Sequence, residues 1–376
     1  MTGYGQAVAR SVEPLVRAVT PPFTQWLQPD EAQEWDAFVA QHPLGLVYHL
    51  TAWKKVLESA FPHIRGRFLA LREAGTARIV AGLPVYTVRS WLLGNRVVSV
   101  PFASLCDPLV SSAAELQQLL LPIGEILRQD ARRLEIRTTK TTHLLGPPSF
   151  PPSSYRHHYL PLNRTPEELF RSFAKTSIRD TVRKAAKAGI QVVEAKGRQA
   201  VELSHAILSE TRLRLSLPPM PVSFFEAMSV HLPERLKIFF ALQNGKPVAC
   251  HLVLADERLW ISEHQGNTRG ASAGANQILC WEIIQRAHAA GAKIFSFGRT
   301  SAGNQGLLVY KRRWSTVEEN LGDFVLRPDA LTLSLPELAQ PREITPSYRI
   351  VRYLSSGKSP QILRTRVGNF CYRHLG

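Results

Sequence analysis

NQILCWEIIQRAHAAGAKIFSFGRT, residues 276–300, is the stretch of sequence that decides the fold. Its first part has apolar residues at helical spacing and leads to Gly291, a residue type that often ends a helix. The second part, AKIFSFGRT, is short and rich in aromatic and apolar residues, which favours a buried strand. The stretch therefore predicts a helix that leads directly into a core strand.

The segments before this stretch predict antiparallel strands. LKIFFALQ and PVACHLVLAD flank Asn244-Gly245, a dipeptide that is typical of a tight hairpin turn. RLWISEHQ, residues 258–265, predicts a third strand before the helix. A hairpin that feeds a strand–loop–helix–strand unit indicates a mixed sheet with helices packed on its faces.

The first half of the chain repeats this order. FLALREAGTARIVAGLPVYTV, from Phe68, predicts another hairpin, and a strand, a helix over 115–129 and the strand RRLEIRT follow it. A repeat of this size indicates duplication of a whole domain. We therefore expect an α/β protein, with α+β mixed sheets, built from two tandem domains of one type.

Changes in composition divide the chain into five expected parts. The stretch GPPSFPPSS is rich in proline and serine and marks the boundary between the two domains. The parts are a flexible leader (1–25), an N-terminal domain (26–146), a Pro/Ser-rich linker (147–154), a C-terminal domain (155–330) and a basic tail (331–376).

The chain is strongly basic, because its 376 residues carry a formal net charge of +16 at pH 7. A positive field of this size attracts phosphates, whether in nucleic acid, nucleotide carriers, pyrophosphate-linked lipids or an anionic membrane, and it does not choose among them. An excess of arginine without a role in binding is the alternative.

Other totals exclude several classes of protein. Hydrophobic residues make up 44% and charged residues 20%, which is typical of a globular protein. No apolar run approaches the roughly 18 to 20 residues of a membrane span, and the N-terminus lacks the apolar core of a secretory signal. The four cysteines form no CxxC pair, so we expect no zinc or other metal site, no disulfide framework and a cytoplasmic location.

Four segments together resemble a known family. They are IRDTVRKAAKAGIQVVEA (178–195), the stretch 276–300, GLLVYKRRW (306–314) and the earlier GLVYHLTAWKKVLESAF (45–61). The order helix–Gly–strand–FGR–YKxxW resembles the Fem family of peptidyl- and aminoacyl-transferases and the related BioF-like acyltransferases associated with exopolysaccharide systems. The resemblance runs from about Trp35 to about Pro328.

The resemblance implies two tandem GNAT-like domains, with a substrate cleft between or along them, and transfer of an acyl group from a carrier to an amine. In the Fem enzymes the carrier is aminoacyl-tRNA and the acceptor is a lipid-linked peptidoglycan precursor. Ser296 stands where family members often carry Asp, and Ser315 replaces a glycine. The long helical arm of some Fem enzymes is absent between about 195 and 240, which weakens the case for tRNA as the donor.

The acyl donor stays open among aminoacyl-tRNA, acyl-CoA and acyl carrier protein, each a phosphate-bearing co-substrate rather than a permanently bound cofactor. The loop GNTRGASAGA before Asn276 offers glycines and a helix N-terminus, where backbone N–H groups bind phosphate or carboxylate, so Asn276 is a substrate-binding candidate. The loop is no P-loop. It also lacks the Arg/Gln-x-x-Gly-x-Gly/Ala run of ordinary acetyl-CoA-dependent acetyltransferases, which counts against coenzyme A.

The acceptor stays open as well. The resemblance favours a lipid-linked or glycan precursor of the cell envelope or of an exopolysaccharide. Two competing functions are a small-molecule N-acyltransferase that uses acyl-CoA or acyl carrier protein, and a non-catalytic binder of RNA or anionic lipid.

Lys311, with Tyr310 and Trp314 beside it, is the catalytic candidate that the resemblance favours. Attack of an amine on an ester or thioester produces an oxyanion, and a lysine that aromatic residues partly remove from water would neutralise it. From the residues alone, an edge lysine whose stem covers the aromatics is the alternative. We expect Tyr310 and Trp314 to bind substrate.

Two other residues are candidates for the site. Arg299 follows Gly298 at a strand end and suits a phosphate or carboxylate, or else a structural ion pair. Asp107, in ASLCDPL, is a second catalytic candidate that would orient or deprotonate the amine, with a plain turn residue as the alternative. No Ser-His-Asp or Cys-His arrangement follows from the spacing, so we prefer direct transfer to a covalent enzyme intermediate.

Two segments of the chain are strongly basic. Lys175, Arg179, Arg183 and Lys187 recur every four residues and predict a phosphate-binding strip on one helix face, with Arg179 and Arg183 as substrate-binding candidates. A favourable interaction with the helix dipole is the alternative. In the tail after Pro341, arginines interleave with apolar residues, which favours either peripheral contact with the inner membrane face or a solvated tail.

Overall fold

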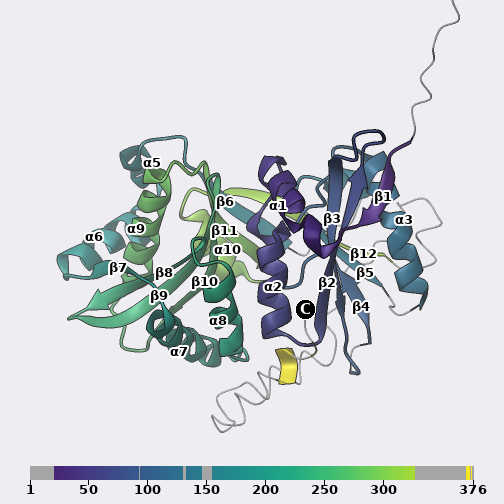
Figure 1. Cartoon of the computed structure of the whole chain (residues 1–376). Coiled ribbons are helices and arrows are strands. Elements are labelled where there is room, and N and C mark those ends of the chain that lie inside the picture. The colour runs from purple at the N-terminus through teal and green to yellow at the C-terminus, as the bar shows by residue number, and fades with distance from the viewer. Residues whose placement is uncertain are drawn as a thin grey trace, which may run out of the picture.

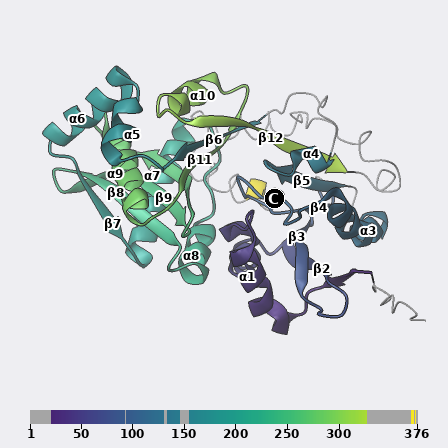
Figure 2. The same cartoon turned by 90° about the horizontal axis from the view of Figure 1, so that it is seen from above.

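The structure of the chain is a computed structural model that describes residues 21–92, 94–129, 133–145, 155–326, 370–372 and 374. Two halves lie side by side, the N-terminal one up to residue 145 and the C-terminal one over 155–326 (Figure 1). Seen from above, helices flank the strands in both halves (Figure 2). The chain has the α/β fold with mixed sheets that the sequence predicts.

Within the described residues, twelve strands form one continuous sheet in the order β1-β2-β3-β4-β5-β12-β6-β11-β10-β9-β8-β7. Neighbouring strands are antiparallel except for the parallel pairs β4–β5 and β10–β11. The order is the same when it is read inward from either edge, as expected for a duplicated domain. The strands are β1 (Phe23–Trp26), β2 (Ile64–Arg72), β3 (Ile79–Val88), β4 (Arg96–Val98), β5 (Leu134–Thr138), β6 (Tyr155–Pro161), β7 (Gln191–Ala195), β8 (Leu236–Gln243), β9 (Lys246–Ala255), β10 (Leu259–Asn267), β11 (Ile294–Ser301) and β12 (Val317–Leu326).

The helices connect these strands and cover them. A π-helical turn, Lys175–Arg179, leads directly into α6. The α-helices are α1 (Ala32–Gln41), α2 (Thr51–Ala60), α3 (Ala113–Gln129), α4 (Thr142–Leu145), α5 (Pro166–Ser172), α6 (Asp180–Lys187), α7 (Arg198–Arg214), α8 (Val222–His231), α9 (Ala275–Ala289) and α10 (Gln305–Arg312).

The local signals in the sequence are confirmed at two turns. The hairpin β8–β9 turns at Asn244 and Gly245, whose φ angles of +51° and +73° lie in the left-handed region that such tight turns require. Gly189, with φ of +74°, follows the end of α6 and its cap residue Ala188, and the amide of Ile190 donates to the Ala185 carbonyl at 3.2 Å. This bond is typical of a Schellman motif and ends the helix where predicted.

Strand β12 belongs to both halves. Its first part, Val317–Leu321, pairs with β6, and its second part, Gly322–Leu326, pairs with β5 of the N-terminal half. The end of the predicted C-terminal domain thus completes the sheet of the N-terminal half. Without β12, β5 would be an exposed edge strand with unpaired backbone groups.

The predicted outer boundaries need one correction. Phe23–Trp26 form β1, which pairs with β2, so the expected leader 1–25 already contains a strand. Pairing with β2 satisfies backbone groups that a flexible leader would leave in water. Residues 1–20, the expected linker 147–154 and the tail over 327–369 lie outside the described residues.

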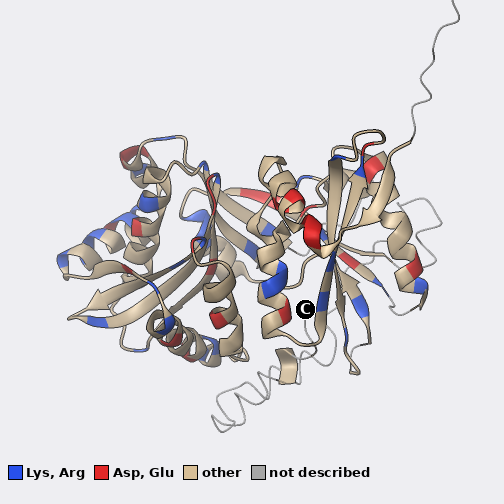
Figure 3. Ribbon diagram, viewed as in Figure 1, with Lys and Arg blue, Asp and Glu red and all other residues tan. Residues whose placement is uncertain are grey.

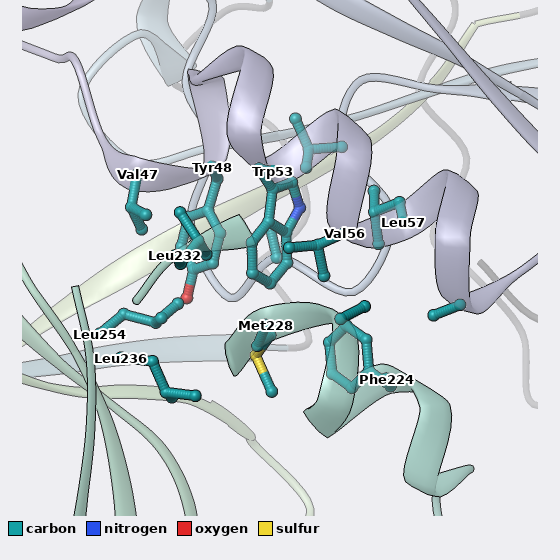
Figure 4. Packing of buried hydrophobic residues seen from close by; sticks show 14 of the residues in the cluster. Val47, Tyr48, Trp53, Val56, Leu57, Phe224, Met228, Leu232, Leu236 and Leu254 are labelled. Carbon is teal, nitrogen blue, oxygen red and sulfur yellow. The ribbon is translucent and has the colours of Figure 1, made fainter. Parts of the chain in front are cut away.

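A hydrophobic core joins the two halves. It includes buried residues of α2 and of α8, and the rings of Trp53 and Phe224 meet edge-on with centroids 6.0 Å apart. Figure 4 shows Tyr48 and Trp53 on one side of this core, facing Met228 and Leu254 on the other. The halves are therefore packed as one body rather than joined only through the sheet.

The described end of the chain also contacts both halves. Tyr372 is buried beside Phe61 and Phe102 of the N-terminal half, and its hydroxyl accepts a hydrogen bond from Arg212 of α7 at 2.7 Å. The last part of the expected basic tail is therefore packed on the body of the protein. Burial of an aromatic ring explains why this part stays on the body.

Among the described residues, no helix combines the length and the apolar character that a membrane crossing requires.

We expect that Gly322→Ala destabilises the protein by about 1–3 kcal/mol, because the added methyl group overpacks the seam between the halves. A Cβ at this position would lie 2.5 Å from Thr138 Oγ1 and 2.6 Å from the Phe324 ring, and both side chains are buried. The apparent midpoint of thermal unfolding measures the effect. The control is Gly303→Ala, where the nearest atom, Ser301 Oγ, is 3.8 Å away. Equal midpoints for both variants would contradict the tight packing of this seam.

Candidate functional site

The central feature of the C-terminal half is the place where β10 and β11 stop pairing. Their parallel register runs from Leu259 opposite Ile294 to Ile261 opposite Ser296. Both strands continue beyond this point, to Asn267 and Ser301, with neighbours on their other sides only. The sheet therefore opens between β10, which stays paired with β9, and β11, which stays paired with β6.

Strand β11 is irregular at the opening, and Lys311 holds it there. The register with β6 shifts between Ser296 and Arg299, and Gly298 has φ of +67°. The Lys311 ammonium of α10 donates to the carbonyls of Phe297, of Gly298 at 3.1 Å and of Arg299 at 3.3 Å. Burial lowers the pKa of Lys311 to about 7.

These contacts account for the whole donor capacity of the lysine. An ammonium group has three N–H bonds, and three carbonyls of β11 surround it. Lys311 is 6% exposed, so it lies buried beside the strand as expected. The contacts support a role in holding the shape of β11. The expected contact with an oxyanion stays a prediction.

The aromatic neighbours of Lys311 pack behind the same strand. Trp314 is completely buried, and its ring lies 5.1 Å from that of Phe173 and 5.9 Å from that of Phe297. Tyr310 lies beside Trp314 at 6.3 Å, and burial raises the pKa of its hydroxyl. Trp314 thus anchors α10 on the core, while Tyr310 is half-buried next to it.

Strand β10 is irregular at the same level, and the extra residue is Glu263. Ser262 pairs with Val253 and His264 with Leu252, which leaves Glu263 without a partner on β9. The Glu263 carboxyl accepts a hydrogen bond from the Tyr48 hydroxyl of the N-terminal half. Removal from water raises the pKa of Glu263 to about 8.

Glu263 and Tyr48 are functional candidates that the sequence analysis missed. Glu263 is a single acid in the expected strand RLWISEHQ, and the period-two pattern of this strand gives no sign of a bulge. Tyr48 is far away in the chain, in the segment GLVYHL that marks the start of the family resemblance. The one available signal was an acidic residue inside an expected core strand.

A loop of the N-terminal half covers the opening. A Cβ at Gly298 would lie 3.4 Å from Ser104 Oγ and 3.6 Å from the Ser262 carbonyl oxygen. These are ordinary contact distances, so β10, β11 and the loop that contains Ser104 converge there. The opening is thus bordered by residues of both halves.

Asp107 lies in the same loop, but its carboxylate serves another segment. Its oxygens accept hydrogen bonds from the backbone amides of Thr139, Lys140 and Thr141 at 2.8–2.9 Å, and from the hydroxyls of Thr139 and Thr141. Asp107 is 4% exposed. These contacts fix the turn after β5. They do not bring the carboxylate to Lys311.

Arg299 lies on β11 next to the seam between the halves. Its guanidinium stacks over the Tyr155 ring at 3.8 Å from the centroid. Its buried Nη1 has no hydrogen-bond partner among the residues that the structure describes. One donor of Arg299 is therefore buried without a partner among the described residues.

Asn276 and the basic helix meet at the start of α9. The Asn276 backbone carbonyl accepts a hydrogen bond from the Gln265 side chain of β10 at 3.4 Å. The Asn276 side-chain amide donates to Asn267 Oδ1 at 3.3 Å. Helix α6 lies directly against this end of α9, since a Cβ at Gly274 would be 2.9 Å from the Thr181 carbonyl. Gln265 was not singled out from the sequence, and it links Asn276 to the open strand.

The expected basic strip on α6 is only partly formed. The π-helical turn Lys175–Arg179 changes the spacing, so a single α-helical face starts at Asp180. Arg183 pairs with Asp180 at 3.3 Å and lies over the Phe170 ring. Arg179 is half-buried in the π turn. Figure 3 shows basic residues on α6, and Asp180 at its start is the one acidic residue of this helix.

Comparison with known proteins identifies the type of domain in which the site lies. Residues 172–312 match the family described as acetyltransferase (GNAT) domain. The C-terminal half contains a GNAT domain. The match includes Glu263, Asn276, Arg299 and Lys311. The protein is an N-acyltransferase of the GNAT type, as the sequence analysis expects.

Solved structures of the same fold extend over most of the chain. FemX covers 83% of this chain and 99% of its own, with a TM-score of 0.64 and 15% identity. The C-terminal domain of a putative lysylphosphatidylglycerol synthetase from Agrobacterium fabrum covers 81% and 94%, with a TM-score of 0.51 and 12% identity. A tandem GNAT protein from the clavulanic acid biosynthesis pathway covers 81% and 98%, with a TM-score of 0.50 and 12% identity.

These neighbours show the tandem GNAT fold over most of the chain. Together with the matched domain they support the expected resemblance to Fem-like GNAT acyltransferases. The search of curated protein sequences gave no match.

We expect that Glu263→Gln raises the stability of the GNAT acyltransferase at alkaline pH. The folded pKa of about 8 lies above the ordinary 4.5, so the uncharged carboxyl stabilises the fold below about pH 4.5. That contribution is lost as the pH rises from about 4.5 through about 8, and an amide cannot ionise. At pH 9 we expect a gain of about 1–3 kcal/mol, reduced from the full shift by partial exposure.

Thermal unfolding of both proteins between pH 5 and pH 9 tests this expectation. The midpoint difference should grow with pH and level off above about pH 8. A difference that does not change with pH would show that Glu263 is not held in an apolar environment.

We also expect that Lys311→Met lowers stability by about 1–3 kcal/mol at pH 7, because three carbonyls of β11 lose their donor. The exposed Lys293→Met, just before β11, is the matched control and should be neutral. Urea unfolding followed by circular dichroism measures both. A Lys311→Met variant as stable as the control would mean that the lysine does not hold the strand.

Proposed function

We propose that the protein transfers an acyl or aminoacyl group from an activated carrier to an amine of a cell-envelope or exopolysaccharide precursor. The observation that carries this proposal is the carboxyl of Glu263, with its raised pKa, at the opening between β10 and β11. The GNAT domain supplies the reaction class, and Glu263 supplies a group suited to the reaction.

The chemistry requires that an ammonium group lose a proton. In the proposed step the amine nitrogen attacks the acyl carbon, the bond from that carbon to the carrier breaks, and the carrier leaves with its ester oxygen or thioester sulfur. Glu263 accepts the proton of the amine, because a base with a pKa near the working pH is the most effective. The hydrogen bond from Tyr48 fixes the direction of the carboxyl.

The residues around the opening have supporting roles in the proposal. Lys311 is a positioning residue that keeps β11 in its irregular shape. Tyr310 and Trp314 form the wall behind this strand. Arg299 offers a free donor to an acidic group of a substrate.

The donor that we propose first is an acyl or aminoacyl group on a carrier other than coenzyme A. In α9 the amide of Ala275 is already bonded to the Ser272 carbonyl, and α6 lies against Gly274, which leaves little room for a pyrophosphate at this end. The basic side chains of Arg179 and Arg183 on the adjoining turn and helix would contact the phosphates of a larger carrier.

One structural neighbour supports an aminoacyl group and a lipid-linked acceptor. The synthetase of lysylphosphatidylglycerol, by its name, makes an aminoacylated lipid, and it shares the tandem fold. We place the protein in the cytoplasm, at the inner face of the membrane where such an acceptor would lie.

A small-molecule N-acyltransferase that uses acyl-CoA is the second candidate. The description of the matching domain as an acetyltransferase favours it. Labelled acetyl-CoA and labelled aminoacyl-tRNA, offered in parallel with a cellular lipid extract and with soluble amines, separate the two. Transfer from neither donor to any acceptor would contradict both candidates in this form and would leave acyl carrier protein as the donor to test next.

We expect that Glu263→Gln lowers the rate of transfer by about 10²–10⁴-fold, the usual contribution of a general base. In the natural protein the rate should rise with pH and level off above about pH 8, since only about a tenth of a group with this pKa is ionised at pH 7. The variant should lose this dependence.

The matched control is Glu257→Gln, an exposed carboxyl in the turn between β9 and β10. It should keep full activity and the pH profile. If Glu263→Gln keeps the activity and the profile as well, another group accepts the proton.

A further inference from the structure

The turn between β3 and β4 exposes a pair of large apolar side chains. Trp91 is 81% exposed and Leu92 is 49% exposed. Five of the other six tryptophans are buried, and Trp26 is half-buried. Contact of such side chains with water is unfavourable, and a local group of them marks a surface with a partner.

The fold holds this pair outward instead of covering it. The Ser90 hydroxyl is bonded to His374 Nδ1 at 2.9 Å, and the Arg96 guanidinium donates to the His374 carbonyl at 3.2 Å. The Trp91 ring lies 5.2 Å from that of His374 and 6.3 Å from that of Phe370. The C-terminal segment thus braces one side of the turn, and Trp91 still faces water.

The same segment adds a third apolar side chain to the tip. Phe370 is 46% exposed, and its ring lies 4.9 Å from that of His374. In Figure 1 this segment is drawn in yellow near the lower ends of the strands of the N-terminal half. Trp91, Leu92 and Phe370 therefore form one exposed apolar group, which we name the aromatic tip.

Basic residues flank the aromatic tip. Arg89 is exposed and lies two residues before Trp91. Arg65 is also exposed, on the neighbouring strand β2, where it pairs with Thr87. A tryptophan with arginines behind it is complementary to the boundary between acyl chains and anionic headgroups of a bilayer.

We propose that the aromatic tip is a membrane contact, which inserts Trp91 and Leu92 into the interface of an anionic bilayer. A lipid surface accepts exposed apolar side chains without a matching pocket, whereas a protein partner would need a complementary one. The positive charge of the chain, +16, draws it to the same surface. This contact is separate from the acyl-transfer chemistry, and Phe370 is the part of the expected tail that belongs to it.

The test uses the full chain with vesicles of phosphatidylcholine alone or mixed with phosphatidylglycerol, without donor or acceptor. Trp91 is the most exposed tryptophan, so its fluorescence should shift to the blue on binding and become protected from acrylamide. Trp91→Phe should still sediment with the mixed vesicles but should lose the shift. No binding to mixed vesicles, or binding without a shift, would overturn the proposal.

Paired variants then measure the strength of the contact. Trp91→Ala with Leu92→Ala should weaken binding to the mixed vesicles by at least about tenfold, because most of the inserted apolar area is gone. The control, Leu121→Ala, removes an apolar side chain that is 60% exposed on α3 and should bind like the natural protein. If the natural protein, the double variant and Leu121→Ala bound equally well, the membrane contact would lie elsewhere.

Transfer to a soluble amine acceptor gives an independent readout. The double variant should keep this activity, since neither residue lies at the opening between β10 and β11. Failure of the membrane proposal can therefore be distinguished from failure of the proposed function.

Discussion

The pairing of β12 with both β5 and β6 is the constraint on which the rest of the structure depends. One strand carries the hydrogen bonds that join the two halves into a single sheet. The shared core around Trp53 and Phe224 then fixes the angle between them. Because the halves are fixed in this way, Tyr48 of one half can direct the carboxyl of Glu263 in the other.

The duplicated halves use equivalent places in different ways. In each half a parallel strand pair ends early, at β4–β5 in the first and at β10–β11 in the second. In the first half the buried Arg137 guanidinium donates to the carbonyls of Val100 and Ala103, at 3.5 and 3.3 Å, and occupies the region after the pair. In the second half the region is bordered by the two bulges and by Glu263. The matched GNAT domain is the second one, in which this opening lies.

Much of the fold follows from short-range patterns in the sequence. Turn residues such as Asn244-Gly245, helix ends such as Gly189 and the repeated order of elements depend on neighbours along the chain, so they are readable without coordinates. The site is different. A bulge at Glu263 depends on the register with β9, and the bond to Tyr48 joins residues far apart in sequence. Lys311 was found from its motif, but its three carbonyl partners appear only once β11 is bent.

The position of β12 has a consequence for synthesis of the protein. β5 leaves the ribosome long before β12, so the first half waits with an unpaired edge until nearly the whole folded region has been made. Contacts between such distant segments slow folding. A nascent chain of this protein therefore needs protection from aggregation during that interval. A chain released from the ribosome before β12 is made would keep β5 as an unpaired edge.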